Sequence, residues 1–366
     1  MTQRLRSTPE EAYKNCTLCP RRCGVDRTAG GRGFCGASDS ITAARASLHY
    51  WEEPCISGMG GSGTVFFTGC PLGCVYCQNR EISGRATSDN RIAEEQTSTW
   101  KTLSGHDLAA IFLRLQAQGA CNINLVTPTH HMPRIAEAVR IAREQGLTLP
   151  IVYNTSGYET EESVRALDGI VDIWLTDCKY YSPAAAARYS GAPDYYPVFT
   201  RALKRMVEQT GDPVFETADG RQISAAEYNE IVCVEDGAED ADDVSTDIGD
   251  QADPEPAGPS ADYAGPLMKR GVIVRHLLLP GLLDDARQIV TDLLTNYGSR
   301  IYLSLMNQYT PMPGLSGYPE IDRHVTAGEY DALVDHALEA GLENGFFQGG
   351  PTDSESFIPL FDGRGL

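Results

Sequence analysis

The sequence predicts an α/β fold with a parallel sheet, because short apolar segments alternate with amphipathic helical segments along most of its 366 residues. Such an alternation favours right-handed crossovers, which bring the carboxyl ends of the strands to one edge of the sheet. The predicted strands are 64–68, 123–127, 151–154, 170–176, 272–279 and 301–306. The predicted helices are 106–117, 133–145, 161–167, 183–189, 282–294 and 327–340.

Local signals support two of these helices in particular. Ser104 precedes 106–117 and is a suitable N-cap, since its hydroxyl can accept from a free backbone N–H of the first turn. Pro133 begins the next helix and Gly146 follows it, which is the distribution of proline and glycine that helices prefer. Both helices are therefore expected between consecutive strands.

The net charge of −20 is concentrated in one stretch. Residues 234–262 carry eleven acidic residues and no Lys or Arg, and they are rich in Gly, Ala, Ser and Pro. Such a composition predicts a disordered acidic insertion. The overall acidity argues against a nucleic-acid partner, which would require a basic face.

Hydropathy and cysteine distribution predict the cellular environment. No stretch approaches the roughly 20 apolar residues of a membrane span, and the first residues lack the apolar core of a secretory signal. The eleven cysteines gather in motifs, which suits metal chemistry in a reducing compartment better than a disulfide framework. We therefore expect a cytoplasmic protein with no membrane partner.

The most informative motif is the C-x3-C-x2-C run of Cys70, Cys74 and Cys77, which follows the first predicted strand. Iron–sulfur clusters normally take four thiolates, so three would leave one iron open to a substrate. Zinc sites usually pair one C-x2-C with a second, distant pair, which makes zinc a poor match. The motif predicts a 4Fe–4S cluster with an open coordination position.

The motif, with Tyr76 before its last cysteine, resembles that of the radical S-adenosylmethionine (radical SAM) superfamily. The resemblance implies a partial six-stranded (β/α)6 TIM-type barrel at residues 61–366, interrupted by the insertion. It also implies that SAM binds the open iron and that the reduced cluster cleaves it to methionine and a 5′-deoxyadenosyl radical. An accessible iron further implies oxygen sensitivity and an anaerobic setting.

Polar residues follow the other predicted strands and become candidate SAM contacts. Thr127 could present a carbonyl where many superfamily members carry a Gly-Gly-Glu-type run, and Asn154 and Ser156 follow the third strand. Asp177 resembles the Asp of an Asp-x-Lys run in glycyl-radical-enzyme activases, with Lys179 completing it, and Arg275 resembles an Arg of their fifth strand. A structural ion pair between Asp177 and Arg275 is the alternative.

Two adjacent histidines near the second strand end leave two interpretations open. His130 and His131 could act as hydrogen-bonding groups or general acids, since histidine titrates near neutral pH. They could equally only cap the helix that follows. His276 alternates with Arg275, so we expect the two side chains on opposite faces of their strand.

An N-terminal module at residues 1–60 carries a second set of cysteines, Cys16, Cys19, Cys23 and Cys35. Four thiolates form a complete ligand set, and both a structural zinc and a second iron–sulfur cluster are chemically allowed. The spacing does not separate the two. Arg21 and Arg22 within this module are interpreted as solvated loop residues, with docking charges as the alternative.

The module and the run from Trp51 to Gly58 resemble uncharacterised radical SAM proteins related to the pyruvate formate-lyase activating enzyme. This resemblance covers nearly the whole chain and implies hydrogen abstraction from a substrate, with a glycine of a partner glycyl radical enzyme as a candidate. The expected reductant is a flavodoxin or ferredoxin. The alternatives are modification of a small molecule or RNA, and a non-catalytic iron–sulfur electron carrier.

Overall fold

The computed structural model describes residues 8–83, 99–235, 263–348 and 359–366. The predicted acidic insertion at 234–262 begins within the last turn of a helix that ends at Glu235, and the rest of it lies outside the described residues. No helix in the described segments is long and apolar enough to cross a bilayer.

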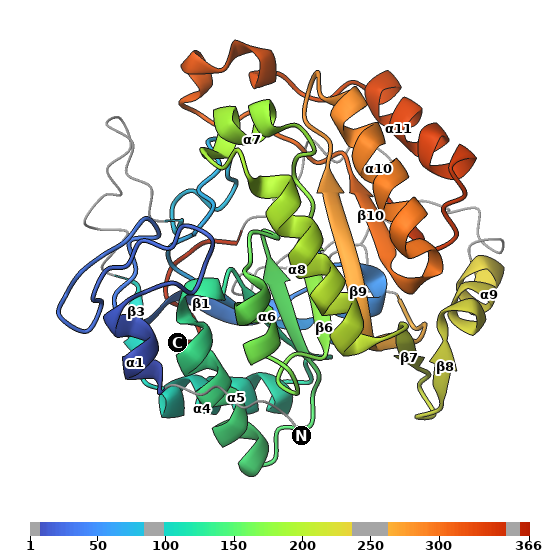
Figure 1. Ribbon diagram of the computed structural model, residues 1–366. Helices are drawn as coiled ribbons and strands as arrows, with labels where there is room; N and C mark the ends of the chain where they lie inside the picture. Colours follow the sequence, from blue (N-terminus) through green and yellow to red (C-terminus); the bar gives the residue numbers. More distant parts are fainter. Residues whose placement is uncertain (1–7, 84–98, 236–262, 349–358) are drawn as a thin grey trace, which may run out of the picture.

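The described residues form an α/β structure (Figure 1). The strands are β1 (Ile41–His49), β2 (Ser62–Phe67), β3 (Lys101–Leu103), β4 (Ile123–Val126), β5 (Ile151–Thr155), β6 (Ile173–Asp177), β7 (Val214–Glu216), β8 (Gln222–Ser224), β9 (Leu267–Leu277), β10 (Tyr302–Met306) and β11 (Gly345–Phe347). The helices are α1 (Pro9–Lys14), α2 (Pro54–Ser57), α4 (Gly105–Ala117), α5 (Met132–Glu144), α6 (Glu161–Ala166), α7 (Pro183–Ser190), α8 (Tyr195–Thr210), α9 (Ala225–Glu235), α10 (Leu283–Tyr297) and α11 (Ala327–Glu339).

Within the described residues, one mostly parallel sheet connects these strands in the order β11-β10-β9-β6-β5-β4-β2-β1-β3. All neighbours from β2 to β11 along this path are parallel, whereas β1 pairs antiparallel with both β2 and β3. A β7–β8 hairpin pairs with the start of β9. All six predicted strands are present and parallel, and this arrangement is consistent with a partial barrel. The predicted number of strands is too low, because β11 pairs parallel with β10 and adds a seventh parallel strand in the described residues.

The six predicted helices are also present, with ends that differ from the prediction by at most three residues. Ser104 caps α4 as predicted: its hydroxyl accepts from the backbone N–H of Asp107 at 3.2 Å, and the Asp107 carboxylate accepts from the Ser104 N–H at 2.9 Å. Helix α8 and strand β1 were not predicted. The helix lacks the clear start signal of α4, since Asp194 makes no side-chain capping bond.

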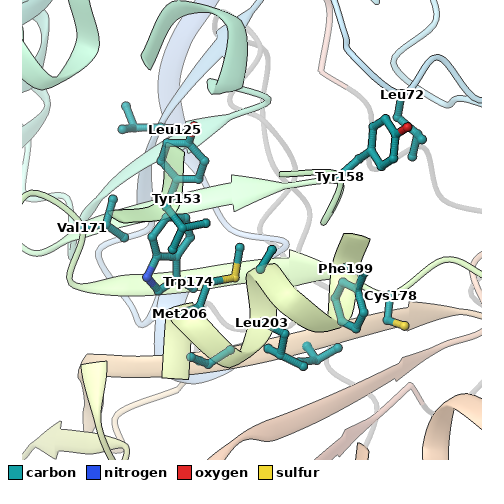
Figure 2. Packing of buried hydrophobic residues seen from close by; sticks show 14 of the residues in the cluster. Leu72, Leu125, Tyr153, Tyr158, Val171, Trp174, Cys178, Phe199, Leu203 and Met206 are labelled. Carbon is teal, nitrogen blue, oxygen red and sulfur yellow. The ribbon is translucent and has the colours of Figure 1, made fainter. Parts of the chain in front are cut away.

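The alternating side chains of the strands build separate cores on the two faces of the sheet. On the outer face, Tyr153 and Trp174 pack beneath the helices, and Figure 2 shows them together with Leu203 and Met206 of α8. On the inner face, neighbouring strand residues join a second cluster with residues of α2 and of the β7–β8 hairpin. This inner cluster includes Val152, Ile173, Leu175, Phe215, Ile273 and Tyr302. It fills the inner face toward the amino ends of the strands.

Candidate active site

A cavity of about 590 Å³ lies at the carboxyl ends of the parallel strands. Its volume is in the range of small-molecule and cofactor sites. All eight predicted cluster and SAM contacts line it: Cys70, Cys74, Cys77, Thr127, Asn154, Ser156, Asp177 and Arg275. The structure therefore brings together residues spread over more than 200 positions of sequence, because the ends of parallel strands meet at one edge.

The cysteine loop, which we define as residues 69–77, leaves β2 through a tight backbone turn. Gly69 and Gly73 have φ of 90° and 65°, a left-handed region that glycine enters without strain. A side chain at Gly69 would meet the carbonyl oxygen of Cys35 at 2.6 Å. The N-terminal cysteine segment, which we define as residues 16–35, therefore packs directly on the start of this loop. The backbone N–H of Gly73 points to Cys70 Sγ at 3.4 Å.

The chemistry of these three thiols fits an iron–sulfur cluster. Burial raises the pKa of Cys70 to about 11 and that of Cys77 to about 12, so without a metal both thiols hold their protons at neutral pH. Binding as thiolates would release those protons. No three His, Cys, Asp or Glu side chains in the described residues lie close enough to hold a single metal ion. A cluster makes a different demand, since each cysteine binds a separate iron.

The end of β4 carries backbone strain at the cavity wall. Thr127 has φ of 56°, a left-handed conformation that is rare for a β-branched residue and concentrated at functional sites. Its N–H donates to the carbonyl of Asn154 at 2.9 Å, which joins the ends of β4 and β5. The strained backbone, rather than the hydroxyl, is the feature that distinguishes this strand end.

Ser156 supplies an unused polar group at the same edge. Its buried hydroxyl lines the cavity and has no hydrogen-bond partner among the described residues. Since buried polar groups are nearly always satisfied, an orphaned hydroxyl in a cavity wall is suited to a ligand. Asn154 also lines the cavity, and its amide lies 3.4 Å from Glu52.

Asp177 and Lys179 form an ion pair at the cavity wall, with Lys179 Nζ 2.7 Å from the Asp177 carboxylate. Burial opposes the charged form of Lys179, but Asp177 and the thiol of Cys74 together raise its pKa. The ammonium therefore stays charged beside the cysteine loop. The alternative prediction of an Asp177–Arg275 ion pair is wrong, because each of these residues has another partner.

Arg275 is held by two glutamates that the sequence analysis did not single out as functional. Its guanidinium donates to both carboxylate oxygens of Glu53, at 2.8 and 2.6 Å, and also to Glu52. Burial alone would raise the pKa of Glu52, but Arg275, His49 and Asn124 lower it. All of Arg275, Glu52 and Glu53 line the cavity, so Arg275 is engaged there and is not a free guanidinium fork.

His130, His131 and His276 do not line this cavity. His130 Nε2 is 2.7 Å from the carbonyl of Thr68, and both His130 and His131 are buried. Burial lowers the pKa of His130 to about 4 and that of His131 well below its usual value, so both are neutral at pH 7. His131 makes no side-chain cap, so the capping interpretation is wrong for it. His276 faces away from the cavity, with Nδ1 2.7 Å from the carbonyl of Cys178, as the alternation predicted.

The N-terminal cysteines form a separate group. Cys16, Cys19 and Cys35 are buried and Cys23 is exposed, and none of them lines the cavity. The buried guanidinium of Arg27 lies 3.8 Å from Cys16 Sγ and also donates to the carbonyls of Ser38 and His130.

Comparison with known proteins identifies the class of protein. The model of the radical SAM superfamily matches residues 64–220, which include the cysteine loop and the strands from β2 through β7. These residues thus form a radical SAM domain, and such a domain implies a 4Fe–4S cluster and SAM.

Two curated proteins are similar to this chain in sequence. An uncharacterized protein of Methanocaldococcus jannaschii is 25% identical over 339 residues, which cover 90% of this chain and 76% of that protein. A protein of Haemophilus influenzae, named as a glycyl-radical enzyme activating enzyme, is 27% identical over 124 residues, or 34% of this chain and 43% of that protein.

Solved structures with a similar arrangement are more distant. The crystal structure of SuiB from Streptococcus suis bound to SAM has a TM-score of 0.42 and 12% identity, over 76% of this chain and 48% of that one. This chain therefore spans about half the length of SuiB. Methylornithine synthase gives a TM-score of 0.38 and 13% identity, over 78% of this chain and 70% of that one.

Proposed function

We propose that this radical SAM enzyme reductively cleaves SAM and abstracts a hydrogen atom from a substrate, with a glycine of a partner glycyl radical enzyme as the favoured target. The observation that carries the proposal is the cavity in which three closely spaced thiols face polar strand ends. The supplied chemistry would be the one-electron cleavage of SAM to methionine and a 5′-deoxyadenosyl radical.

In this proposal three groups of residues have separate roles. Cys70, Cys74 and Cys77 would hold the cluster and leave one coordination position open. Thr127, Asn154, Ser156 and Asp177 would seat SAM through carbonyl, amide, hydroxyl and carboxylate groups. Arg275 would act indirectly, by keeping Glu52 and Glu53 ordered in the wall, because its donors already face those carboxylates.

The glycyl-radical target rests on the relationship to the Haemophilus influenzae protein, which matches about a third of this chain. A protein substrate also suits a partial barrel, since the path of paired strands from β11 to β3 does not close in the described residues. The reductant would be a flavodoxin or ferredoxin. Cys16, Cys19, Cys23 and Cys35 in the module at residues 1–60 would form a second metal site, either zinc or a second cluster. Zinc would require these thiols to move, because no three of them lie close enough to hold a single ion.

The test is an anaerobic reconstitution with iron and sulfide, followed by dithionite and SAM, with 5′-deoxyadenosine and bound iron as readouts. We expect product from the wild type, and loss of both product and about four irons in Cys74→Ser. Cys121→Ser is the matched control, because Cys121 does not line the cavity. Product formation by a folded Cys74→Ser chain would contradict the proposal.

The partner requires a separate experiment. The reduced enzyme with SAM would be mixed with a candidate glycyl radical enzyme, and the glycyl radical would be sought by EPR spectroscopy. A radical that depends on both SAM and the Cys74 thiol supports the proposed target. SAM cleavage without any protein radical would favour a small-molecule substrate.

A further inference from the structure

Ser190, the last residue of α7, points its hydroxyl at the cysteine loop. Its Oγ lies 3.1 Å from Cys74 Sγ and 2.7 Å from the hydroxyl of Tyr180, and the side chain is fully buried. A metal-bound thiolate carries no proton and can only accept. Ser190 must then donate to Cys74, and Tyr180 must donate to Ser190. The two hydrogen bonds therefore point the same way, from Tyr180 through Ser190 to Cys74.

We propose that Ser190 is a positioning residue that sets the reduction potential of a cluster bound to the cysteine loop, and that Arg21 holds it in place. The inference rests on the proposed function, because it needs a cluster on Cys74. It adds residues that belong neither to the cysteine motif nor to the strand ends.

Arg21, in the N-terminal segment, contacts both segments that carry the Ser190–Cys74 hydrogen bond, namely the cysteine loop and the end of α7. Its guanidinium donates to the carbonyls of Pro71 and Leu72 in the cysteine loop, at 3.0 and 3.1 Å. It also donates to the carbonyls of Ser190 and Gly191 at the end of α7, at 2.8 and 2.5 Å. Four carbonyls from two segments are thus held by one planar cation.

The geometry of Arg21 is itself fixed. Its guanidinium lies 3.9 Å from the ring centre of Phe34 and 5.3 Å from that of Tyr158. Stacking on an aromatic ring is a contact that arginine makes and lysine does not reproduce, and the rigid fork then matches carbonyls on both sides. The expectation that Arg21 is a solvated loop residue is therefore wrong, whereas Arg22 pairs only with Glu162 at 3.6 Å and is exposed.

The physical consequence follows from charge. Reduction adds an electron to the cluster and places more negative charge on its sulfurs, so a hydrogen-bond donor stabilises the reduced form more than the oxidised form. Hydrogen bonds to the sulfurs are one of the factors that set cluster potentials. Burial of the Tyr180–Ser190–Cys74 chain strengthens it, since a low-dielectric interior favours such networks.

The experiment measures the midpoint potential of the reconstituted full chain by EPR-monitored redox titration. Ser190→Ala is expected to lower the potential, and Tyr180→Phe to lower it less, because Ser190 can still donate. Ser182→Ala is the control at the other end of α7: it removes the N-cap hydroxyl, which accepts from Ala184 and Ala185. A potential unchanged in Ser190→Ala, or lowered equally by Ser182→Ala, overturns the proposal.

A second pair of variants tests Arg21. We expect Arg21→Ala to lower the midpoint potential in the same direction as Ser190→Ala, and Arg22→Ala to leave it unchanged. Arg21→Lys is expected to recover only part of the shift. An Arg21→Ala potential equal to that of the wild type would remove Arg21 from the proposal.

Iron content separates this inference from the proposed function. If the wild type binds no iron at the cysteine loop, the proposed function fails and the inference fails with it. If the wild type binds about four irons and cleaves SAM, while Ser190→Ala titrates at the wild-type potential, only the inference fails.

Discussion

The cysteine loop and the N-terminal cysteine segment contain the same reactive side chain at similar spacing, yet their surroundings differ. Cys70, Cys74 and Cys77 line a cavity of about 590 Å³ at the strand ends. Cys16, Cys19 and Cys35 are buried in irregular backbone beside Arg27, and none of them reaches that cavity. The two groups therefore differ in their placement relative to the sheet more than in their cysteine spacing.

The two regions are nonetheless connected. The carbonyl of Cys35 packs against Gly69, and Arg21 donates to the carbonyls of Pro71 and Leu72. The hydroxyl of Ser163, in α6, donates to the carbonyl of Leu18 at 2.6 Å. The N-terminal segment therefore packs on the cysteine loop and on a barrel helix, and a change in one region is expected to reach the other through these contacts.

The largest expected difference is in 5′-deoxyadenosine formation, when one cysteine of each region is replaced by serine. Cys74→Ser should abolish 5′-deoxyadenosine formation, because a cluster held by two thiolates would be lost. Cys19→Ser should reduce the bound metal by the content of one N-terminal site while measurable product remains. Metal analysis and product assay on the two variants check this. Equal loss of product in both would mean that the N-terminal segment is as necessary for SAM cleavage as the loop.

In the cavity wall, Arg275→Ala should destabilise the chain by roughly 3–5 kcal/mol, because it leaves Glu52 and Glu53 buried without their cation. Urea unfolding under anaerobic conditions measures the effect. Lys269→Ala is the matched control: its ion pair with Glu216, at 2.9 Å, is partly exposed and should contribute under about 1 kcal/mol. Similar losses in both variants would show that the Arg275 cluster is no more important than a surface pair.

Between the sheet and the N-terminal segment, Glu159 predicts a pH effect. Burial raises its pKa to about 7 from 4.5, despite hydrogen bonds from Thr129 and Thr155. The folded chain thus binds the proton more tightly than the unfolded chain, and this contribution to stability is full below about pH 4.5 and is lost as the pH rises through about 7.

Glu159→Gln should therefore match the wild type near pH 4.5 and exceed it at pH 8 by on the order of 3 kcal/mol. Unfolding free energies measured across this range give the difference between the two chains. Glu162→Gln, at an exposed site, should leave the pH profile unchanged. A constant difference between wild type and Glu159→Gln at all pH values would show that Glu159 is not protonated on folding.

The smallest expected effect concerns the strained turn of the cavity. Thr127→Gly should raise the free energy of unfolding by up to about 1 kcal/mol, because glycine adopts a φ of 56° without strain but loses more entropy on folding. SAM affinity should persist if the Thr127 carbonyl is the contact. Thr127→Val keeps the strain and serves as the comparison; loss of SAM binding in both would identify the hydroxyl as the contact instead.

Parts of the molecule were predictable from the sequence because their signals are local. The six predicted strands follow from apolar runs between helical segments, and the cap at Ser104 follows from the residue types around it. The cysteine loop was recognisable from its spacing. Strand β1 and helix α8 were missed, since the pairing of β1 with both β2 and β3 depends on residues distant in sequence.

The candidate active site was also only partly predictable from the sequence. Asp177 and Arg275 were expected at the cavity, but the partners of Arg275 were not, because Glu52 and Glu53 reach it only after the strands are aligned. The amino-acid sequence by itself determined the thiol chemistry, the α/β class and the order of the strands along the chain. Only the tertiary structure decided which charges neutralise one another and which hydroxyl meets Cys74, since those contacts join residues as many as 223 positions apart.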